Sequence, residues 1–356
     1  MFETVIGYLV YIASVAGMFL ILIAPHEAGH FLVAKLCRVR VLEFSIGAGT
    51  KLWSVTRGGT LYALRLLPIL GYVRMGGMEA GEFEQPDGFH SRPAYQRIAI
   101  LAAGPVANFL VAMVLITGFG LTQLNGNPGK VVSIIIDSPA SVAGIQAGDQ
   151  IKTIDGKPVN SPGDIAQQEL AAAGRPVTLT GTHSNGQPFS LQVTPACKPQ
   201  SCQMGVEIAR VVTPLTAVTD GVRFPFQATQ VIFQGLGSLV TGQVKGGLLG
   251  PDGLTGPIGI AKITTDTVNQ GLPAYVWLVA LLSVALGITN LLPLLALDGG
   301  RIVVVIVEWL RRRPFDRNSE LSFQRWGLAA LLALAALISF LDIQRIITGQ
   351  FPGLQP

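Results

Sequence analysis

The chain has 356 residues, of which 49% are hydrophobic and only 13% carry a charged side chain. That charged share is about half of what soluble globular proteins contain, and the mean hydropathy is +0.50. This composition argues against a soluble enzyme and favours an integral membrane protein. The net charge of +4 is small and the sequence has no long basic run, so we expect no nucleic acid among its partners.

Four segments are predicted to cross a membrane as helices: 1–36, 98–123, 274–298 and 324–345. The first three contain an uncharged stretch of about the length that a bilayer requires, whereas the uncharged core of the fourth, between Arg325 and Asp342, is short for a span. Basic residues gather between the first and second segments and again after the third. The positive-inside rule therefore predicts that these two connections lie in the cytoplasm. Both termini are then expected outside it.

The remaining segments differ in character. Residues 37–97 contain strand-like stretches around Gly58-Gly59, which predict a membrane-associated β-hairpin sheet. Residues 124–212 alternate strand patterns with Gly and Asp turns and predict an inserted extracytoplasmic α/β domain. Residues 213–273 are interpreted as an amphipathic surface segment, although 214–250 could also be ordinary loop and helix. Residues 299–323 are interpreted as a basic cytoplasmic loop. The expected fold class is an α-helical membrane protein with about four transmembrane helices, the hairpin sheet and the inserted domain.

The chain contains three cysteines, Cys37, Cys197 and Cys202. None of them form a C-x-x-C pair, which argues against a structural zinc finger. Cys197 and Cys202 lie close together in a hydrophilic stretch, "ACKPQSC". They are either free thiols or a small disulfide, the latter if this region faces an oxidising compartment.

The first segment contains the motif H-E-x-x-H, as His26-Glu27-Ala28-Gly29-His30. On a helix, residues four apart share a face, so the two imidazoles can bind one metal ion. Glu27 lies beside them and can accept a proton from water activated by that metal. A pair of unused helix-face histidines is the alternative, but polar groups in a membrane span are costly. Pro25 precedes the motif and is expected to kink the helix.

A catalytic zinc usually has three protein ligands, so the motif needs one more. His90 lies in a polar loop and His183 in the predicted outer domain, which makes both poor candidates. Asp298, in "NLLPLLALDGG", is expected at the cytoplasmic end of the third segment, on the same side as the motif. There it would be a carboxylate at a helix C-terminus, which is unfavourable unless a metal binds it.

The two motifs "HEAGH" and "NLLPLLALDGG" together resemble the site-2 protease family of intramembrane zinc metalloproteases, most of all the bacterial regulator of sigma-E protease type. The stretches "FSIGAG", "LLPILGYVRMGG", "GPVANF" and "GPIGIA" extend the resemblance over nearly the whole chain. The resemblance implies that zinc (Zn2+) binds His26, His30 and Asp298, and that Glu27 is the general base.

The resemblance also implies the setting in which the protein works. It implies a bacterial inner membrane and a PDZ fold for residues 124–212, with one PDZ-like domain where several relatives have two. The expected partners are the lipid bilayer and transmembrane protein substrates. An anti-sigma factor or a remnant signal peptide would be such a substrate.

Three further residues are predicted to bind substrate. Asn290 and Pro293 are placed within the third segment, where the proline would free backbone groups to pair with an extended substrate. Asn290 could hydrogen-bond that substrate or could pack between helices. Asn108 in the second segment has the same two interpretations.

The function that these patterns favour is a zinc-dependent intramembrane endopeptidase that cleaves transmembrane segments in regulated intramembrane proteolysis. A membrane metal-ion carrier could use the same three ligands, and an inactive PDZ scaffold would use none. Glu27 is not needed as a ligand and therefore favours the protease. We find no internal repeat of the kind that many transporters show.

Overall fold

The computed structural model describes residues 2–79, 81–198, 201–243, 247, 250, 253–294 and 296–351. The chain divides into two compact units. We call residues 1–116 and 220–356 the helical unit, and residues 117–219 the small unit. Each is described by itself.

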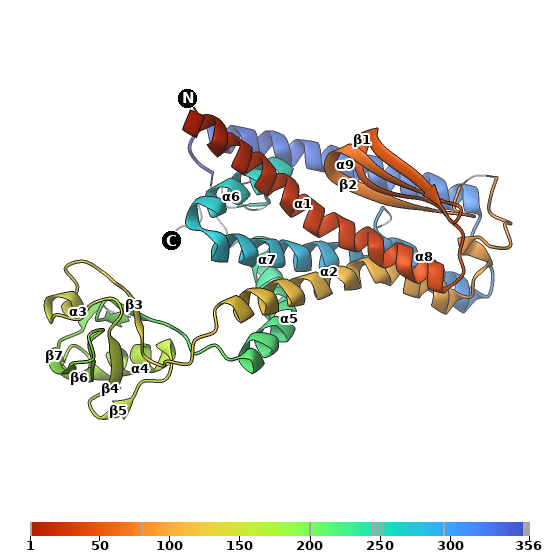
Figure 1. Ribbon diagram of the computed structural model, residues 1–356. Helices are drawn as coiled ribbons and strands as arrows, with labels where there is room; N and C mark the ends of the chain where they lie inside the picture. The colour runs from red at the N-terminus through yellow and green to blue at the C-terminus, as the bar shows by residue number, and fades with distance from the viewer. Residues whose placement is uncertain are drawn as a thin grey trace. The chain divides into compact units, whose positions relative to one another are not determined.

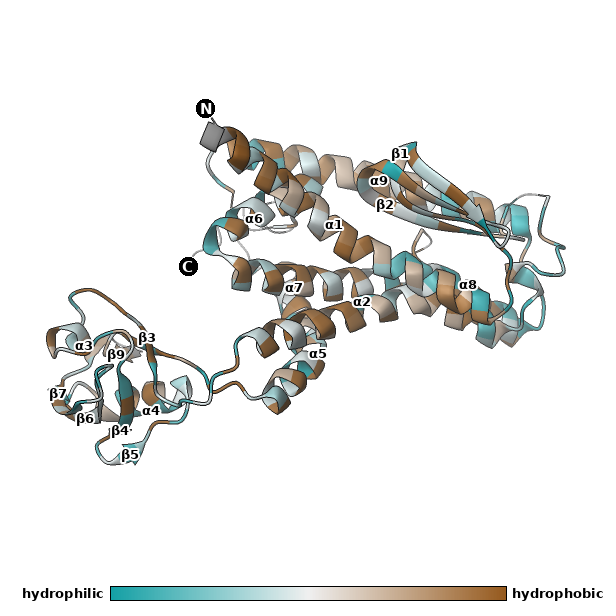
Figure 2. Cartoon of the chain, viewed as in Figure 1, coloured by the Kyte–Doolittle hydropathy of each residue, from teal (hydrophilic) through white to brown (hydrophobic). Residues whose placement is uncertain are grey.

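Four long helices in the described residues are apolar enough to cross a membrane: α1 (Phe2–Leu36), α2 (Ala94–Thr122), α7 (Leu272–Leu291) and α9 (Arg317–Ile347). In Figure 2 much of the ribbon of these helices has the colours of hydrophobic residues. Large apolar side chains such as Leu9, Ile12 and Leu332 are more than half exposed. Helix faces with so many exposed apolar side chains are stable in contact with lipid, but their exposure to water would be unfavourable. The four predicted transmembrane segments are confirmed as candidate spans, and the protein is a membrane protein.

Three further helices belong wholly or mostly to the helical unit, namely α5 (Pro214–Val240), α6 (Pro257–Gln270) and α8 (Asp298–Arg311). The structure adds detail to two of the predicted segments. The segment 213–273 contains α5 and α6, and Thr264 and Thr267 of α6 are almost fully buried. The segment 299–323 contains helix α8 rather than only a loop.

The third span is shorter than the sequence suggested. Helix α7 ends at Leu291, and Leu292 is extended with φ −64° and ψ 145°. Pro293 follows, and a residue before proline is disfavoured in the helical conformation. Asp298 then begins α8. It therefore lies at a helix N-terminus, where the dipole favours a carboxylate. This is the reverse of the helix C-terminus expected from the sequence.

The predicted hairpin consists of β1 (Val41–Arg57) and β2 (Thr60–Met75), shown in orange in Figure 1. Both strands bend, so each pairs twice with the other. Residues 51–57 pair with 60–65, residues 61–64 pair with 43–46, and residues 41–46 pair with 71–75. The segment 71–75 is therefore at one edge of a curled sheet. A short 3-10 helix, η1 (Phe89–Ser91), lies between the hairpin and α2.

The small unit combines strands and helices, as predicted. Its strands are β3 (Val131–Ile134), β4 (Gln150–Ile154), β5 (Lys157–Pro158), β6 (Val177–Thr182), β7 (Pro188–Val193), β8 (Ala196–Lys198), β9 (Ser201–Gln203) and β10 (Val206–Ile208). Its short helices are α3 (Pro139–Val142) and α4 (Pro162–Ala172). A four-stranded sheet has the order β5-β4-β6-β7, while β10 pairs with β3 and β8 with β9.

The small unit has a core of its own. Ile151, Ile154 and Leu179 are at most 1% exposed, and α4 covers them with Ile165. Helix α4 begins with a capping box, in which Ser161 and Asp164 satisfy each other's backbone N–H groups. Cys197 and Cys202 form a disulfide between β8 and β9.

Candidate metal centre

Helix α1 carries the H-E-x-x-H motif near its end. The helix continues through Pro25 without a break in its assignment. His26 and His30 are 8% and 6% exposed, and they lie one turn apart on the same face. The sequence prediction that one face of a helix presents both imidazoles is borne out by this geometry.

Asp298 meets both histidines. Its Oδ2 lies 3.3 Å from His26 Nε2 and 3.3 Å from His30 Nε2, and the two Nε2 atoms are 3.2 Å apart. These three residues also form a group with the spacing that a metal ion requires. The structure therefore brings together the three residues that the sequence predicted as ligands, from α1 and the first turn of α8.

The hydrogen bonding of His30 determines what its Nε2 offers. His30 Nδ1 lies 2.7 Å from the backbone carbonyl oxygen of Ile100. A carbonyl can only accept, so Nδ1 must carry the hydrogen, and the neutral ring then has a lone pair at Nε2. That lone pair points at a carboxylate oxygen, which is also an acceptor. Such a convergence of lone pairs is unfavourable unless a cation lies among them.

The distances fit such a cation. In a tetrahedral zinc site with bonds of about 2.0–2.2 Å, neighbouring ligand atoms lie about 3.3 Å apart. The three separations of 3.2, 3.3 and 3.3 Å match that value. Two imidazoles and a carboxylate are also a ligand set that zinc commonly has in enzymes. The residues present therefore fit a zinc ion.

Gly104 of α2 makes space for both imidazoles. A Cβ atom at this position would lie 2.3 Å from His30 Nε2 and 2.8 Å from His26 Cε1, closer than any real contact. The sequence analysis missed this residue, although it is the first residue of the quoted stretch "GPVANF". A glycine inside a helical segment can indicate a close approach by another element. Only the packing of α2 against α1 shows that the imidazoles make this approach.

Asn108 is one turn further along α2 and is fully buried. Its Nδ2 atom lies 3.2 Å from His26 Nδ1, and its Oδ1 atom then has no hydrogen-bond partner. Rotating the amide by half a turn places Oδ1 where it accepts a hydrogen from His26 Nδ1. His26 Nε2 then has a free lone pair, like His30 Nε2. The geometry therefore indicates that Asn108 holds His26 in place. This role is favoured instead of the contact with substrate that the sequence predicted.

Helix α8 is fixed close to α2, which positions Asp298. Arg97 of α2 donates to Glu308 of α8 at 2.7 Å, and both side chains are largely buried. Val305 of α8 packs in an apolar cluster with Ala34 and Leu101. Asp298 therefore does not depend on a flexible loop for its position.

A groove of about 430 Å³ leads to Glu27 and His26. It is lined on the other side by Leu286 and Asn290 of α7 and by Gly71 of β2. A Cβ at Gly71 would lie 2.8 Å from Glu27 Cγ, so the glycine allows the sheet edge to run directly against the glutamate. The base and the edge of the hairpin sheet thus border the same space.

The other two predicted substrate residues are placed differently. Asn290 lines the groove and donates its Nδ2 hydrogen to the Leu286 carbonyl of its own helix at 3.1 Å. Pro293 lies two residues beyond the end of α7, is exposed, and is not among the described residues that line the groove. The sequence prediction that Pro293 interrupts a span is therefore corrected, because the proline follows the helix end.

Comparison with protein families adds the deciding observation. The family described as "Peptidase family M50" matches residues 14–334 of the chain. The chain belongs to peptidase family M50. This is the site-2 protease family that the two motifs indicated, and its members are zinc-dependent membrane metalloproteases.

Named relatives of this M50 protease agree. A putative zinc metalloprotease of Clostridium perfringens is 32% identical over 338 residues, covering 94% of this chain and 98% of the relative. The zinc metalloprotease RasP of Bacillus licheniformis is 29% identical over 410 residues, covering 90% and 96%. The regulator of sigma-W protease RasP of Bacillus subtilis is 28% identical over 407 residues, covering 90% and 95%.

The two remaining histidines of this M50 protease have surroundings of other kinds. His183, in the small unit, lies 2.9 Å from Asp149 Oδ2. His90 lies against the rings of Phe83 and Phe89. Burial, followed by the nearby charges of Arg317 and Arg97, lowers the pKa of His90 to about 4. Neither histidine belongs to the His26, His30 and Asp298 cluster, as the sequence analysis expected.

Proposed function

We propose that this M50 protease is an intramembrane endopeptidase in which His26, His30 and Asp298 bind the zinc and Glu27 is the general base. The observation that carries the proposal is the convergence of two imidazole nitrogens and a carboxylate oxygen in a buried site, where the histidines come from a helix that can span a membrane. Bound zinc supplies Lewis acidity, which activates water and polarises the scissile carbonyl.

Glu27 performs the proton transfers in this proposal. Its carboxylate borders the groove beside His26 without joining the three ligands. It accepts a proton from the attacking water and delivers it to the leaving amine nitrogen, as a positioned general acid–base does. A metal-ion carrier would not need this carboxylate, so its position supports the protease over the carrier.

The substrate enters this site as an extended chain. Helical hydrogen bonds shield the peptide bonds of a transmembrane segment, so the segment must unwind locally before it is cleaved. The edge of the hairpin sheet at 71–75 adjoins Glu27 and offers backbone partners to such a chain. Asn290, on the opposite wall, can hydrogen-bond the substrate backbone, and Asn108 holds His26 in place.

The substrates are the transmembrane segments of membrane proteins. One relative is named a regulator of sigma-W protease, which supports an anti-sigma factor as one substrate. Remnant signal peptides are the other class with the required chemistry, since they are short apolar helices in the membrane. Cleavage of either would be a step of regulated intramembrane proteolysis.

The enzyme would work in the bacterial inner membrane, with the small unit outside the cytoplasm as a PDZ-like domain. Two observations support this orientation. Basic residues concentrate at 37–97 and 301–325, which the positive-inside rule assigns to the cytoplasm. The Cys197–Cys202 disulfide of the small unit is of the kind that persists in oxidising compartments.

A cleavage assay with metal analysis tests the proposal. The purified protein and its Glu27→Gln variant are incubated in liposomes with a tagged transmembrane substrate, and bound zinc is measured in both. Glu79→Gln serves as the matched control, because Glu79 is exposed and far from α1 in the sequence.

We expect cleavage by the wild type and by Glu79→Gln, no cleavage by Glu27→Gln, and equal zinc in all three. Cleavage by Glu27→Gln at the wild-type rate would remove Glu27 from the mechanism. Zinc that persists in a variant lacking His26, His30 and Asp298 would show that the ligand set is wrong.

A further inference from the structure

The small unit contains a second groove, which the proposed protease chemistry does not use. It has a volume of about 350 Å³ and lies between α4 and β10. Helix α4 contributes Pro162, Ile165, Ala166 and Glu169, whose spacing of three and four residues places them on one helix face. Ile208 of β10 forms part of the opposite wall.

Strand β10 is an edge strand. In the described part of the chain it pairs with β3 alone, and its residues Val206 and Ile208 line the groove. An edge strand leaves backbone N–H and C=O groups without a strand partner, and these can pair with an added extended peptide. A groove with an edge strand on one side and a helix face on the other has the shape for such a peptide.

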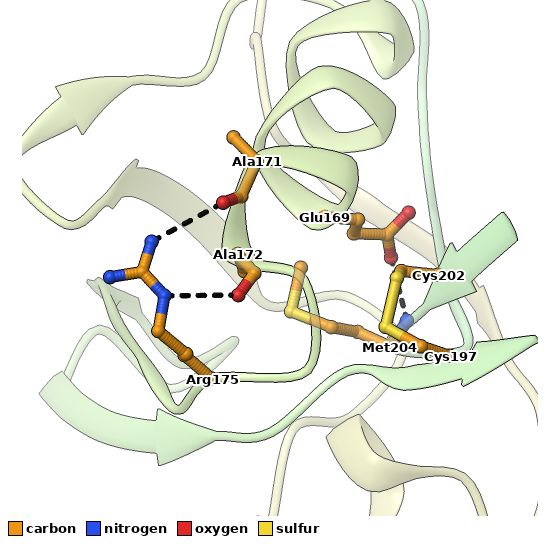
Figure 3. Close-up of a disulfide and its surroundings, with 7 residues drawn as sticks. All are labelled: Glu169, Ala171, Ala172, Arg175, Cys197, Cys202 and Met204. Atoms are coloured by element: carbon orange, nitrogen blue, oxygen red, sulfur yellow. Dashed lines mark hydrogen bonds between the residues drawn. A yellow bond between two sulfur atoms is a disulfide. The ribbon is translucent and has the colours of Figure 1, made fainter.

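The loop that leads into β10 already holds a carboxylate. Glu169 Oε1 accepts a hydrogen bond from the backbone N–H of Met204 at 2.6 Å, and Glu169 is only 7% exposed. Figure 3 shows this contact near the Cys197–Cys202 disulfide. Met204 is itself fully buried, and its carbonyl accepts from Ala140 N. Glu169 therefore fills the place where an added strand could direct a terminal carboxylate towards a backbone donor.

The groove is also acidic. Glu207, next to Val206 on β10, is exposed, and its Oε2 accepts from Ser133 Oγ at 2.7 Å. Glu169 and Glu207 are the charged residues among the described lining residues, and no lysine or arginine accompanies them. Burial raises the pKa of Glu169, partly offset by its bond from Met204 N–H. A second carboxylate entering the groove would meet repulsion, whereas a basic side chain would meet a partner.

We propose that this groove binds an internal, extended polypeptide segment that carries basic side chains, and that Glu169 excludes a free C-terminal carboxylate. Apolar side chains of such a segment would contact Ile165 and Ile208, and basic side chains beside Glu169 or Glu207 would meet an opposite charge. The site would thus bind a segment within a polypeptide chain and would not capture a free C-terminus. This goes beyond the proposed peptide cleavage and does not depend on zinc.

Peptide binding to the full-length protein tests the inference. The probes are labelled peptides of alternating valine and lysine, one with a C-terminal amide and one with a free acid, and a third with glutamate in place of lysine. Binding is measured by fluorescence anisotropy in a neutral detergent. The Glu27→Gln background prevents cleavage of the probes, so the result does not depend on the protease function.

Glu169→Gln is the diagnostic variant, and Glu79→Gln is the control that removes the same charge outside the groove. We expect the amide to bind about fivefold more tightly than the acid, because two carboxylates repel in a partly solvated groove. Glu169→Gln should abolish that preference, Glu79→Gln should retain it, and the glutamate peptide should bind most weakly.

Three results would overturn the proposal. The first is an acid peptide that binds wild type as tightly as the amide. The second is an unchanged preference in Glu169→Gln, with the circular dichroism of the variant unaltered. The third is no binding of any probe up to about 1 mM, a weak limit for a specific site.

Discussion

Each unit contains an aspartate in contact with histidine, and the two contacts differ in chemistry. In the helical unit, Asp298 meets His26 and His30 at 3.3 Å. In the small unit, Asp149 meets His183 at 2.9 Å. The difference lies in the number of hydrogen-bond donors that each carboxylate has around it.

Asp149 is satisfied by donors from the protein. Besides His183 Nδ1, its oxygens accept backbone N–H groups from Gln146 and Ser184 at 2.9 and 3.0 Å. Asp298 Oδ2 instead lies 3.3 Å from two imidazole Nε2 atoms. His30 Nδ1 directs its hydrogen at the Ile100 carbonyl, and once the Asn108 amide is turned to accept from His26 Nδ1, both neutral rings have their lone pair at Nε2. A carboxylate supplied with donors has a structural role, whereas converging acceptors require a cation.

The sharpest test of this comparison changes each aspartate to asparagine. Asp298→Asn removes a charged metal ligand, and we expect zinc affinity to fall by more than about 100-fold, since even groups that only orient a ligand contribute 10- to 100-fold. Proteolysis should become undetectable. Zinc content after chelator competition and substrate cleavage are the measurements.

Asp149→Asn is the matched change in the small unit. It should leave zinc affinity and proteolysis near wild type, while the loss of charge-assisted bonds lowers the free energy of unfolding by about 1–3 kcal/mol. Equal zinc affinity in Asp298→Asn and Asp149→Asn would mean that the two contacts do not differ in kind.

Filling the space beside Gly104 is expected to have the next largest effect on zinc binding. Gly104→Ala places a methyl group 2.3 Å from His30 Nε2, so His30 must leave its position and zinc binding should fall by at least about tenfold. Gly118→Ala in the same helix meets no atom within 4 Å and should change neither zinc content nor cleavage. A Gly104→Ala variant with full zinc affinity would show that the site does not need this close approach.

Two asparagines separate metal positioning from substrate binding. Asn108→Leu removes the partner of His26 Nδ1, and we expect zinc affinity to fall about 10- to 100-fold. Asn290→Leu should leave zinc affinity unchanged and raise KM, because Asn290 lines the groove and bonds only its own helix among the contacts described. If Asn108→Leu changes KM alone, the substrate role expected from the sequence is correct.

His90 affects stability alone, and only at acidic pH. Its folded-state pKa is about 4, below the ordinary value of 6.5, so between these values the unfolded chain binds more protons. The stabilisation is complete above about pH 6.5 and is lost as the pH falls towards 4, by at most about 3 kcal/mol. Melting temperatures of wild type and His90→Gln in detergent should therefore diverge from pH 7 to pH 4, with wild type falling further. Parallel curves would contradict the shift.

Much of the fold could be predicted from the sequence because its signals are local. Four apolar stretches identified the candidate spans, and Gly58-Gly59 indicated the hairpin. The H-E-x-x-H motif defined one face of one helix by spacing alone. The sequence was less informative where a helix ends, since the apolar run to Leu297 concealed the end of α7 at Leu291.

The sequence thus determined which residues are candidates for metal chemistry, namely His26, Glu27, His30 and Asp298. The spacing on one helix and a recognisable second motif are enough to identify them. Only the tertiary structure decided which atoms meet. Asp298 begins a helix instead of ending one, Gly104 admits the imidazoles, Asn108 turns towards His26, and Glu169 occupies the Met204 amide. These contacts join residues far apart in the chain, and no local pattern records how two packed helices, or a helix and a loop, align their hydrogen-bonding groups.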